Sequence, residues 1–276
     1  MTILNMQTTL ESIEVKLLLE GIYQHYGYDF RDYTSLHDRI QRLMAQENLK
    51  TISGLQERVL HDPDWFHRIL AEFFITVSAM FRDPQFFLNF RQNVVPRLKT
   101  YPFIRLWFAG CGCGEEIYSM AILLHEEGLY DRCRFYGTDI NESALNQAQK
   151  SIFPLHLRQK YTRDYLAAGG KSSFSKYYTA KYDHAIFHSW LKQRFVFSKH
   201  NLVSDSSFNE FQVILCRNVL IYFNNPLQHR VHKLLYDSLI RLGFLGLGNS
   251  ESIFSTPYRD CFETLKGCDK IYQKMK

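Results

Sequence analysis

Apolar residues recur at helical spacing through residues 9–75. The three sets are Ile13, Leu17 and Leu18; Ile40, Leu43 and Met44; and Ile52, Leu55, Val59 and Leu60. Gly27 and the pair Asp62-Pro63 interrupt the pattern, as residues of these types do at helix ends. The pattern therefore predicts a small all-α domain over residues 1–75.

From residue 104 onward, short apolar runs alternate with segments of helical spacing. The predicted strands are 104–109, 134–139, 194–198, 211–216, 244–248, and a pair near 262–265 and 270–274; the predicted helices are 116–127, 142–150 and 226–241. Strands that alternate with helices predict a doubly wound parallel sheet, so the fold class is α/β and Rossmann-like. The last pair of strands predicts an antiparallel edge.

Two segments fall outside this alternation. Residues 76–103 predict a connector with one helix that begins near Asp83-Pro84, because proline suits the first helical turn. Residues 151–193 are too long for a simple crossover and predict an inserted subdomain. The predicted organisation is a helical domain, this connector, and an α/β domain over residues 104–276 that carries the insertion.

The first predicted strand runs into three alternating glycines, Gly110, Gly112 and Gly114, which Glu115 and Glu116 follow. A strand, a glycine turn and a helix can hold a nucleotide-like ligand, since glycine lets the backbone approach and helix-terminal N–H groups face the ligand. Two carboxylates at the rim disfavour a pyrophosphate and favour a cationic cofactor without phosphate. S-adenosyl-L-methionine, with its ammonium and sulfonium groups, fits this description.

Polar residues also follow two other predicted strands. Asp139 ends the second strand, where a carboxylate can accept hydrogen bonds from ribose hydroxyls. The alternative is that Asp139 caps the next helix, a role that Asn141 can take instead. Arg217 and Asn218 end the strand 211–216, and Tyr222 comes shortly after them.

Ligands of open α/β sheets bind outside the carboxyl ends of the strands. Arg217, Asn218 and Tyr222 are therefore predicted to face the same crevice as the glycine turn and Asp139. The alternative is structural, with Arg217 in an ion pair and Tyr222 packed in the core.

The net charge of +5 is unevenly spread along the chain. Residues 1–75 hold seven basic and eleven acidic residues, whereas residues 150–200 hold ten basic residues against Asp164 and Asp183. The basic segment is also rich in Tyr and Phe. Such a surface attracts polyanions, either nucleic acid or an acidic protein helix.

Composition narrows the class of protein further. A hydrophobic content of 46% over 276 residues supports a proper core. The sequence has no apolar run of eighteen residues and does not start with a basic segment followed by an apolar stretch, so we expect no membrane insertion and no secretion signal. Its six cysteines include no Cys-x-x-Cys pair. We therefore expect reduced thiols, no metal site and a cytoplasmic location.

Taken together, these motifs resemble the CheR family of chemoreceptor glutamate methyltransferases. The matching elements are residues 78–84, 109–119, 137–140, 200–202, 216–223 and 247–252, in the order of the family. The most specific of them reads Cys-Arg-Asn-Val-Leu-Ile-Tyr-Phe at 216–223. The helical start and the basic insertion also fit, so the resemblance covers essentially the whole chain.

The resemblance implies that S-adenosylmethionine methylates a receptor glutamate during signal adaptation, giving a γ-carboxyl methyl ester and S-adenosyl-L-homocysteine. The implied partner is the cytoplasmic helical region of a methyl-accepting receptor. The catalytic residues implied are Arg82 and Tyr222; the cofactor-binding residues are Thr76, Ser78, Arg82, Gly110, Glu115, Asp139, Asn201, Leu202, Arg217 and Asn218.

The sequence departs from the family pattern at four places, one of which is Gly112-Cys113 in the cofactor loop, where Ser- or Thr-like residues are common. Ser78 stands where Thr is usual, and Thr76 stands where an Asn often contacts the cofactor. Residues 163–192 do not resemble the compact glycine-rich β-hairpin that binds a receptor's C-terminal peptide tether. We therefore expect docking that needs no tether.

Three other functions were weighed. A nucleic-acid methyltransferase would suit the basic, aromatic insertion, but the sequence has no Asn-Pro-Pro-Tyr, Asp-Pro-Pro-Tyr or Pro-Cys element, so no nucleic-acid partner is expected. A non-catalytic module that binds the cofactor only as a sensor is the second alternative, and intact Arg82 and Tyr222 argue against it. A nicotinamide-dependent oxidoreductase is disfavoured by the acidic rim at Glu115-Glu116.

Overall fold

The computed structural model describes residues 3–33, 36–74 and 78–276, and it forms two compact units. The helical unit holds the described residues up to 74 together with Ile221–Gln228. The α/β unit holds residues 78–220 and His229–Lys276. The domain boundaries drawn from the sequence stay a prediction, and the two units are described separately below.

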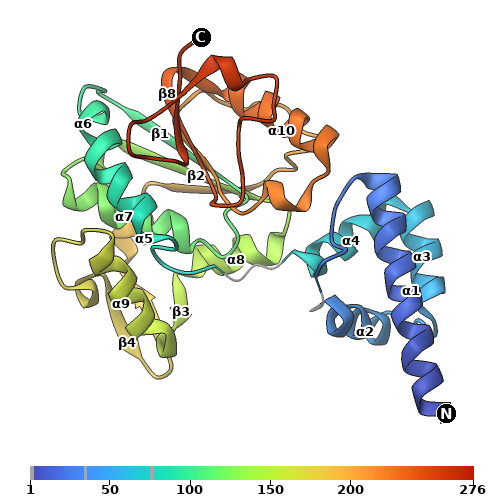
Figure 1. The fold of residues 1–276 in the computed structure, drawn as a ribbon. Helices are drawn as coiled ribbons and strands as arrows, with labels where there is room; N and C mark the ends of the chain where they lie inside the picture. Colours follow the sequence, from blue (N-terminus) through green and yellow to red (C-terminus); the bar gives the residue numbers. More distant parts are fainter. Residues whose placement is uncertain (1–2, 34–35, 75–77) are drawn as a thin grey trace. The chain divides into compact units, whose positions relative to one another are not determined.

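The helical unit is built from α1 (Ile3–Tyr26), α2 (Leu36–Gln46), α3 (Ile52–His61) and α4 (Pro63–Phe73). Helix α3 packs against α1 and α4, and α2 packs against α4 (Figure 1). Asp62 separates α3 from α4 and caps α4 by accepting a hydrogen bond from the Asp64 N–H, with Pro63 at the first helical position. The predicted break at Asp62-Pro63 is confirmed.

The buried face of α1 differs from the predicted one. Leu18 is buried, as expected, but its buried neighbours are Leu19 and Ile22. Ile13 and Leu17 are 49% and 55% exposed, so the prediction that they share one face with Leu18 is wrong. The apolar residues of α1 lie on more than one face, and spacing alone does not say which face the rest of the unit covers.

A mostly parallel sheet forms the centre of the α/β unit. Its strands are β1 (Ile104–Ala109), β2 (Cys133–Asp139), β6 (Phe195–Lys199), β7 (Phe211–Cys216), β8 (Leu239–Leu247), β9 (Phe262–Thr264) and β10 (Ile271–Lys274). Their spatial order is β6-β2-β1-β7-β8-β10-β9, in which β10 pairs antiparallel with both β8 and β9. The predicted parallel sheet with an antiparallel edge is confirmed.

Helices cover both faces of this sheet. They are α5 (Pro84–Asn89), α6 (Val95–Leu98), α7 (Glu115–Glu126), α8 (Glu142–Lys150) and α10 (Asn225–Ser238). Helices α5, α6 and α7 lie on one side of the sheet and α10 on the other (Figure 1). Leu106 and Phe108 of β1 join the core beneath α5–α7, while Trp107 stacks on Phe211 at the opposite face. This alternation is the two-residue period expected of a strand.

One predicted boundary is wrong. The helix α10 ends at Ser238 rather than at 241, and β8 begins at Leu239 rather than at 244. Leu239 pairs with Phe211, after which the register shifts before Val213 meets Phe244. Leu242 has φ +65° within this irregular stretch. A β-bulge therefore hides the strand start from a search for regular alternation.

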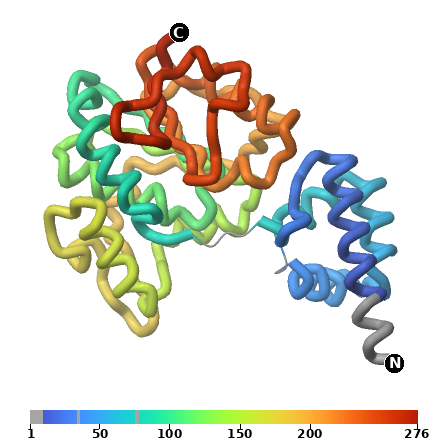
Figure 2. Tube along the Cα trace, viewed as in Figure 1, coloured from blue at the N-terminus to red at the C-terminus, as the bar shows by residue number. Residues whose placement is uncertain are grey.

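The insertion forms a small lobe of its own, coloured yellow in Figure 2. It contains β3 (Ile152–Pro154), α9 (Arg158–Ala167), β4 (Tyr178–Lys181) and β5 (His184–Phe187). The three strands form an antiparallel sheet in the order β3-β5-β4. Strands β4 and β5 make a hairpin whose turn, Tyr182-Asp183, contains no glycine. The expectation that this segment is not the glycine-rich hairpin that binds a C-terminal tether stays a prediction.

Glu126, at the end of α7, anchors this lobe to the sheet. Its Oε1 accepts hydrogen bonds from the hydroxyl of Tyr165, the hydroxyl of Tyr177 at 2.8 Å and the N–H of Lys171 at 3.1 Å. Its Oε2 lies 2.8 Å from the buried guanidinium of Arg91. A buried carboxylate with this many donors fixes the insertion to the α/β unit.

Candidate functional site

The glycine turn after β1 has a left-handed backbone conformation that residues with a side chain rarely adopt. Gly110, Gly112 and Gly114 have φ of +77°, +53° and +94°, in the left-handed region that favours glycine. The N–H of Gly110 donates to the Thr138 carbonyl at 2.8 Å, and the N–H of Gly112 donates to the Asp139 carboxylate at 2.8 Å. The turn is therefore bonded to the carboxyl end of β2.

The same turn also lies against the segment that follows β7. A Cβ atom on Gly110 would lie 2.5 Å from Cγ2 of Val219. In the sheet β1 has β2 on one side and β7 on the other, so the direction of the strand order reverses between β1 and β7. This reversal is where open α/β sheets bind ligands. The predicted meeting of residues 110–114, Asp139 and the end of β7 is thus found.

Glu115 opens α7 directly after the turn. The residue is 6% exposed, and its Oε2 has no hydrogen-bond partner within the described residues. Burial raises the pKa of this carboxyl to about 7, although the residue's own backbone N–H favours the ionised form. A buried carboxylate with an unpaired oxygen suits a cationic group of a ligand, such as the ammonium of S-adenosylmethionine.

Asp139 lies at the end of β2 with both oxygens in use. Oδ2 accepts the N–H of Gly112, and Oδ1 accepts the N–H of Asn141 at 2.9 Å. Burial nevertheless raises the pKa of this carboxyl. The cap of α8 is Asn141, whose side chain accepts the Ala144 N–H at 3.1 Å. Asp139 is therefore not needed as a cap and shapes the glycine turn instead.

Asn201 and Leu202 follow β6, the strand beside β2. The N–H of His200 donates to the Asp139 carbonyl at 3.1 Å, which places this segment next to the predicted ribose-binding position. The side chain of Asn201 accepts the Val203 N–H at 2.9 Å, and Leu202 is buried. Their predicted contacts with the adenine end of the cofactor stay predictions.

Arg217 is held in a buried ion-pair network. Its guanidinium contacts the carboxylate of Glu116 and lies 2.7 Å from the carboxylate of Asp83. It also lies over the Phe86 ring, 4.1 Å from the centroid. Glu116 is therefore paired with Arg217, whereas Oε2 of Glu115 is buried without a hydrogen-bond partner among the described residues. The structural alternative for Arg217 is found, and its predicted contact with the cofactor stays a prediction.

Arg82 and its neighbours sit close to this network. Arg82 is exposed and forms no ion pair within the described residues, because Asp83 is engaged by Arg217. Its backbone carbonyl accepts a hydrogen bond from Arg217 at 3.3 Å. Ser78 is partly buried, and Thr76 lies outside the described residues. The predicted roles of all three stay predictions.

Two residues that the sequence analysis left without a role organise the site. The carboxylate of Glu251 accepts the N–H groups of Asn218, Val219, Leu220 and Gly248, at 2.9, 2.7, 2.7 and 2.6 Å. It thereby fixes the loop after β7, where Asn218 has a left-handed φ of +61°. In the sequence, the only indication of a role for Glu251 was its place in the family motif at residues 247–252.

Ser119 is the second of these residues. Its hydroxyl accepts the Phe81 N–H at 2.9 Å and donates to the Glu115 carbonyl at 2.6 Å. The segment that carries Arg82 is thus bonded to the first turn of α7. No sequence signal distinguished this serine from an ordinary helix residue.

Tyr222 belongs to the helical unit. It is 8% exposed, and its ring lies among Phe74, Tyr33 and Phe30 with centroid distances of 5.0, 5.4 and 5.8 Å. Burial among rings matches the structural alternative. The predicted catalytic role of Tyr222 stays a prediction.

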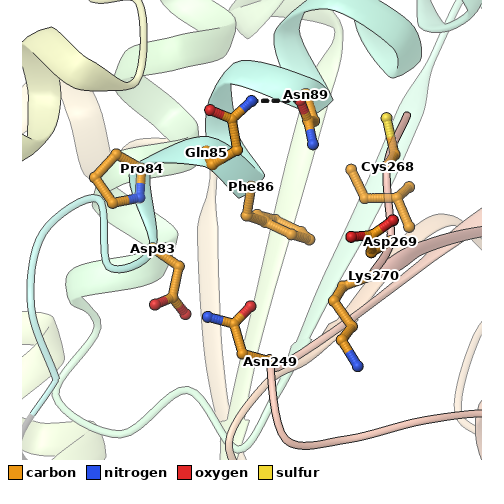
Figure 3. Close-up of a pocket in the computed structure, with 10 residues that line it drawn as sticks. Asp83, Pro84, Gln85, Phe86, Asn89, Asn249, Cys268, Asp269 and Lys270 are labelled. Atoms are coloured by element: carbon orange, nitrogen blue, oxygen red, sulfur yellow. Dashed lines mark hydrogen bonds between the residues drawn. The ribbon is translucent and has the colours of Figure 1, made fainter. Parts of the chain in front are cut away.

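A pocket of about 240 Å³ borders the Arg217 network (Figure 3). Phe86 lies in its middle, and the side chains of Asp83 and Asn249 point toward each other at one edge. None of the predicted cofactor-binding residues lines it. Among the described residues, no group of three His, Cys, Asp or Glu side chains could hold a metal ion, and no helix could cross a membrane.

The fold and the site define an S-adenosylmethionine-dependent methyltransferase: a mostly parallel sheet with one antiparallel strand, a glycine turn at the strand-order reversal, and acids after β1 and β2. The chain belongs to the CheR methyltransferase family. The family's S-adenosylmethionine-binding domain matches residues 76–269, and its all-α domain matches residues 13–74.

Relatives agree with this assignment. Cher3 of Pseudomonas putida KT2440, a candidate methyltransferase by its name, is 48% identical over 264 residues, which cover 95% of this chain and 97% of that protein. A chemotaxis protein methyltransferase of Listeria innocua is 27% identical, covering 83% of this chain and 86% of its own. One from Borreliella burgdorferi is 26% identical, covering 90% and 91%.

Proposed function

We propose that this methyltransferase forms γ-methyl esters on glutamates of methyl-accepting receptors, in the cytoplasm, during signal adaptation. The observation that carries the proposal is the buried, unpaired carboxylate oxygen of Glu115 beside the glycine turn of a CheR family member. It is the group expected to bind the ammonium of the methyl donor. The relatives from Listeria and Borreliella are named as chemotaxis methyltransferases, which supports receptors as substrates.

S-adenosylmethionine is a substrate of this reaction, and when bound it supplies an electrophilic methyl group on a sulfonium. In the proposed complex Glu115 holds the ammonium, Asp139 holds the ribose hydroxyls, and Asn201 and Leu202 line the adenine. The remaining cofactor contacts proposed are those of Thr76, Ser78, Arg82, Gly110, Arg217 and Asn218. Each assignment extends the family resemblance to a residue of this chain.

The acceptor is a glutamate carboxylate, which is already ionised at neutral pH, so no strong general base is required. Its oxygen forms the new bond to the methyl carbon, while the electrons of the carbon–sulfur bond stay on sulfur and no proton moves. Catalysis then rests on in-line alignment and partial desolvation. Arg82 positions the acceptor carboxylate, and Tyr222 orients the methyl donor.

The basic insertion is the proposed docking surface for the receptor. Part of its charge is neutralised, since Lys160 contacts Asp164 and Lys171 contacts Glu127. Arg158 and Lys176 are exposed and form no ion pair within the described residues. These cations suit the acidic region around receptor methylation sites, and docking is proposed to need no C-terminal tether.

The test combines methyl-labelled S-adenosylmethionine with receptor-containing membranes and then treats the protein with mild base. Label released as methanol supports a carboxyl ester. Asp139→Ala should abolish cofactor binding, and Arg82→Ala should slow transfer. Arg105→Ala, at the amino end of β1, is the control and should do neither. Label on added RNA or DNA, with none on protein, would overturn the proposal.

A further inference from the structure

The end of the signature motif at residues 216–223 belongs to the helical unit, which holds Ile221–Gln228. Its backbone pairs with the loop after α1: the Asp29 N–H donates to the Tyr222 carbonyl at 2.8 Å, and the Asn224 N–H donates to the Gly27 carbonyl at 2.8 Å. Tyr28 and Phe223 form an antiparallel bridge between these two hydrogen bonds. Residues 222–224 are therefore held in one register against residues 27–29.

Gly27 makes this close approach possible. Its φ is +80°, and a Cβ there would lie 2.8 Å from Nδ2 of Asn224. Tyr28 packs edge-on against Phe223, with centroids 5.3 Å apart. The helical unit thus fixes the backbone on both sides of the Tyr222 carbonyl.

The side chain of Tyr222 is fixed by the same unit. Phe30, Phe74 and Tyr33 surround its ring, and Tyr33 lies nearly parallel to it, at an interplanar angle of 31°. The two tyrosines are also hydrogen-bonded. The pKa of Tyr33 is raised to about 12, mainly because the side chain is buried. The nearby Tyr222 contributes less, through its charge and through this hydrogen bond. The hydroxyl of Tyr33 therefore stays protonated at physiological pH.

We propose that Tyr33 is a positioning residue for methyl transfer, which holds the Tyr222 hydroxyl in its working orientation. The inference rests on the proposed function, in which Tyr222 orients the methyl donor. A ring whose rotation is already restricted loses less freedom when the reacting groups align.

A second anchor strengthens this reading. Glu251, in the α/β unit, holds the N–H groups of residues 218–220, just before Tyr222 in the chain. Along the chain, Tyr222 therefore follows a backbone stretch that Glu251 fixes. The tyrosine cannot change its orientation without breaking its ring contacts with Phe30, Tyr33 and Phe74.

The test is a double-mutant cycle on the full-length protein. Tyr33→Phe removes one hydroxyl and should lower kcat by about tenfold, the effect of one hydrogen bond, while the affinity for S-adenosylmethionine stays unchanged. Tyr222→Phe should lower kcat at least as much. The double variant Tyr33→Phe/Tyr222→Phe should be no slower than Tyr222→Phe alone, because Tyr33 acts only through Tyr222.

Tyr26→Phe is the matched control. The hydroxyl of Tyr26 also lies in the helical unit and donates to the Val59 carbonyl at 2.8 Å, and the Tyr26 ring stacks on Phe66. This variant should lose stability and keep its kcat. If Tyr222→Phe keeps wild-type kcat, the proposed role of Tyr222 fails. If Tyr222→Phe is slow but Tyr33→Phe is not, or if the two effects multiply, Tyr33 is not a positioning residue.

Discussion

Glu115→Gln should stabilise the ligand-free protein while weakening its binding of S-adenosylmethionine. The carboxylate is 6% exposed and one of its oxygens has no partner, so in the free protein its charge opposes folding. Glutamine keeps the shape and removes the charge. The same change removes the partner proposed for the ammonium of the methyl donor, so stability and binding should move in opposite directions.

The magnitude follows from the pKa of Glu115, which burial raises from its ordinary value of 4.5 to about 7. At about 1.36 kcal/mol per pH unit, this interval corresponds to a cost of about 3 kcal/mol to the free energy of unfolding above pH 7. Because the folded state binds the proton more tightly, this contribution to stability falls as pH rises from 4.5 to about 7. The stability gained by Glu115→Gln over the wild type should therefore grow as pH rises from 4.5 to about 7.

The assay is thermal unfolding at a series of pH values. At pH 8 the midpoint of Glu115→Gln should exceed that of the wild type by up to roughly 10 °C, and below pH 4.5 the two should converge. Calorimetry should give an affinity for S-adenosylmethionine reduced roughly ten- to a hundredfold at pH 8. In the wild type this affinity should rise with pH up to about 7.

The same substitution at the adjacent acid, Glu116, should have the opposite effect on stability. Glu116→Gln removes a partner of the buried Arg217 guanidinium and should destabilise the protein at pH 8. If Glu115→Gln destabilises the free protein at pH 8, or if it binds S-adenosylmethionine as tightly as the wild type, the account of Glu115 is refuted.

Three further substitutions, with one control, test residues that shape the glycine turn, the loop after β7 and the inserted lobe. Glu251→Gln turns an amide N–H toward backbone N–H donors. It should lower the free energy of unfolding, measured with urea, by about 2–4 kcal/mol and should slow methyl transfer. Unchanged stability and rate would contradict the role of Glu251 in fixing the loop after β7. Gly110→Ala, which would clash with Val219, should bind S-adenosylmethionine at least about tenfold more weakly. Gly128→Ala, with the same left-handed φ but open space, should bind normally. Glu126→Gln should speed hydrogen exchange in α9 and β4 without changing cofactor affinity; equal exchange would mean that another contact anchors the lobe.

The sequence predicted the features that local pattern determines. Apolar runs with helices between them gave the parallel sheet, and the glycines after β1 gave the turn at the strand-order reversal. Asp139 was expected at the carboxyl end of β2, and it lies there, bonded to Gly112. These features depend on spacing along one element and on the fixed direction of parallel strands.

Features that depend on pairing across the chain were not predictable in this way. Arg217 lies 101 residues from Glu116 in the sequence, and nothing in either motif indicates that they pair. Tyr222 follows a strand of the α/β unit yet packs with Phe30 and Phe74 of the helical unit. Which face of α1 is buried likewise depends on the helices around it, which the spacing of Leu17 and its neighbours does not encode.

The central claim is that a receptor glutamate receives the methyl group. The most direct measurement is peptide mass spectrometry of receptor cytoplasmic fragments after incubation with S-adenosylmethionine that carries a trideuteromethyl group. The account predicts the mass of one such group on glutamate side chains, lost after mild base and absent with Asp139→Ala. The same mass on lysine, arginine or an N-terminus, stable to base, would contradict it.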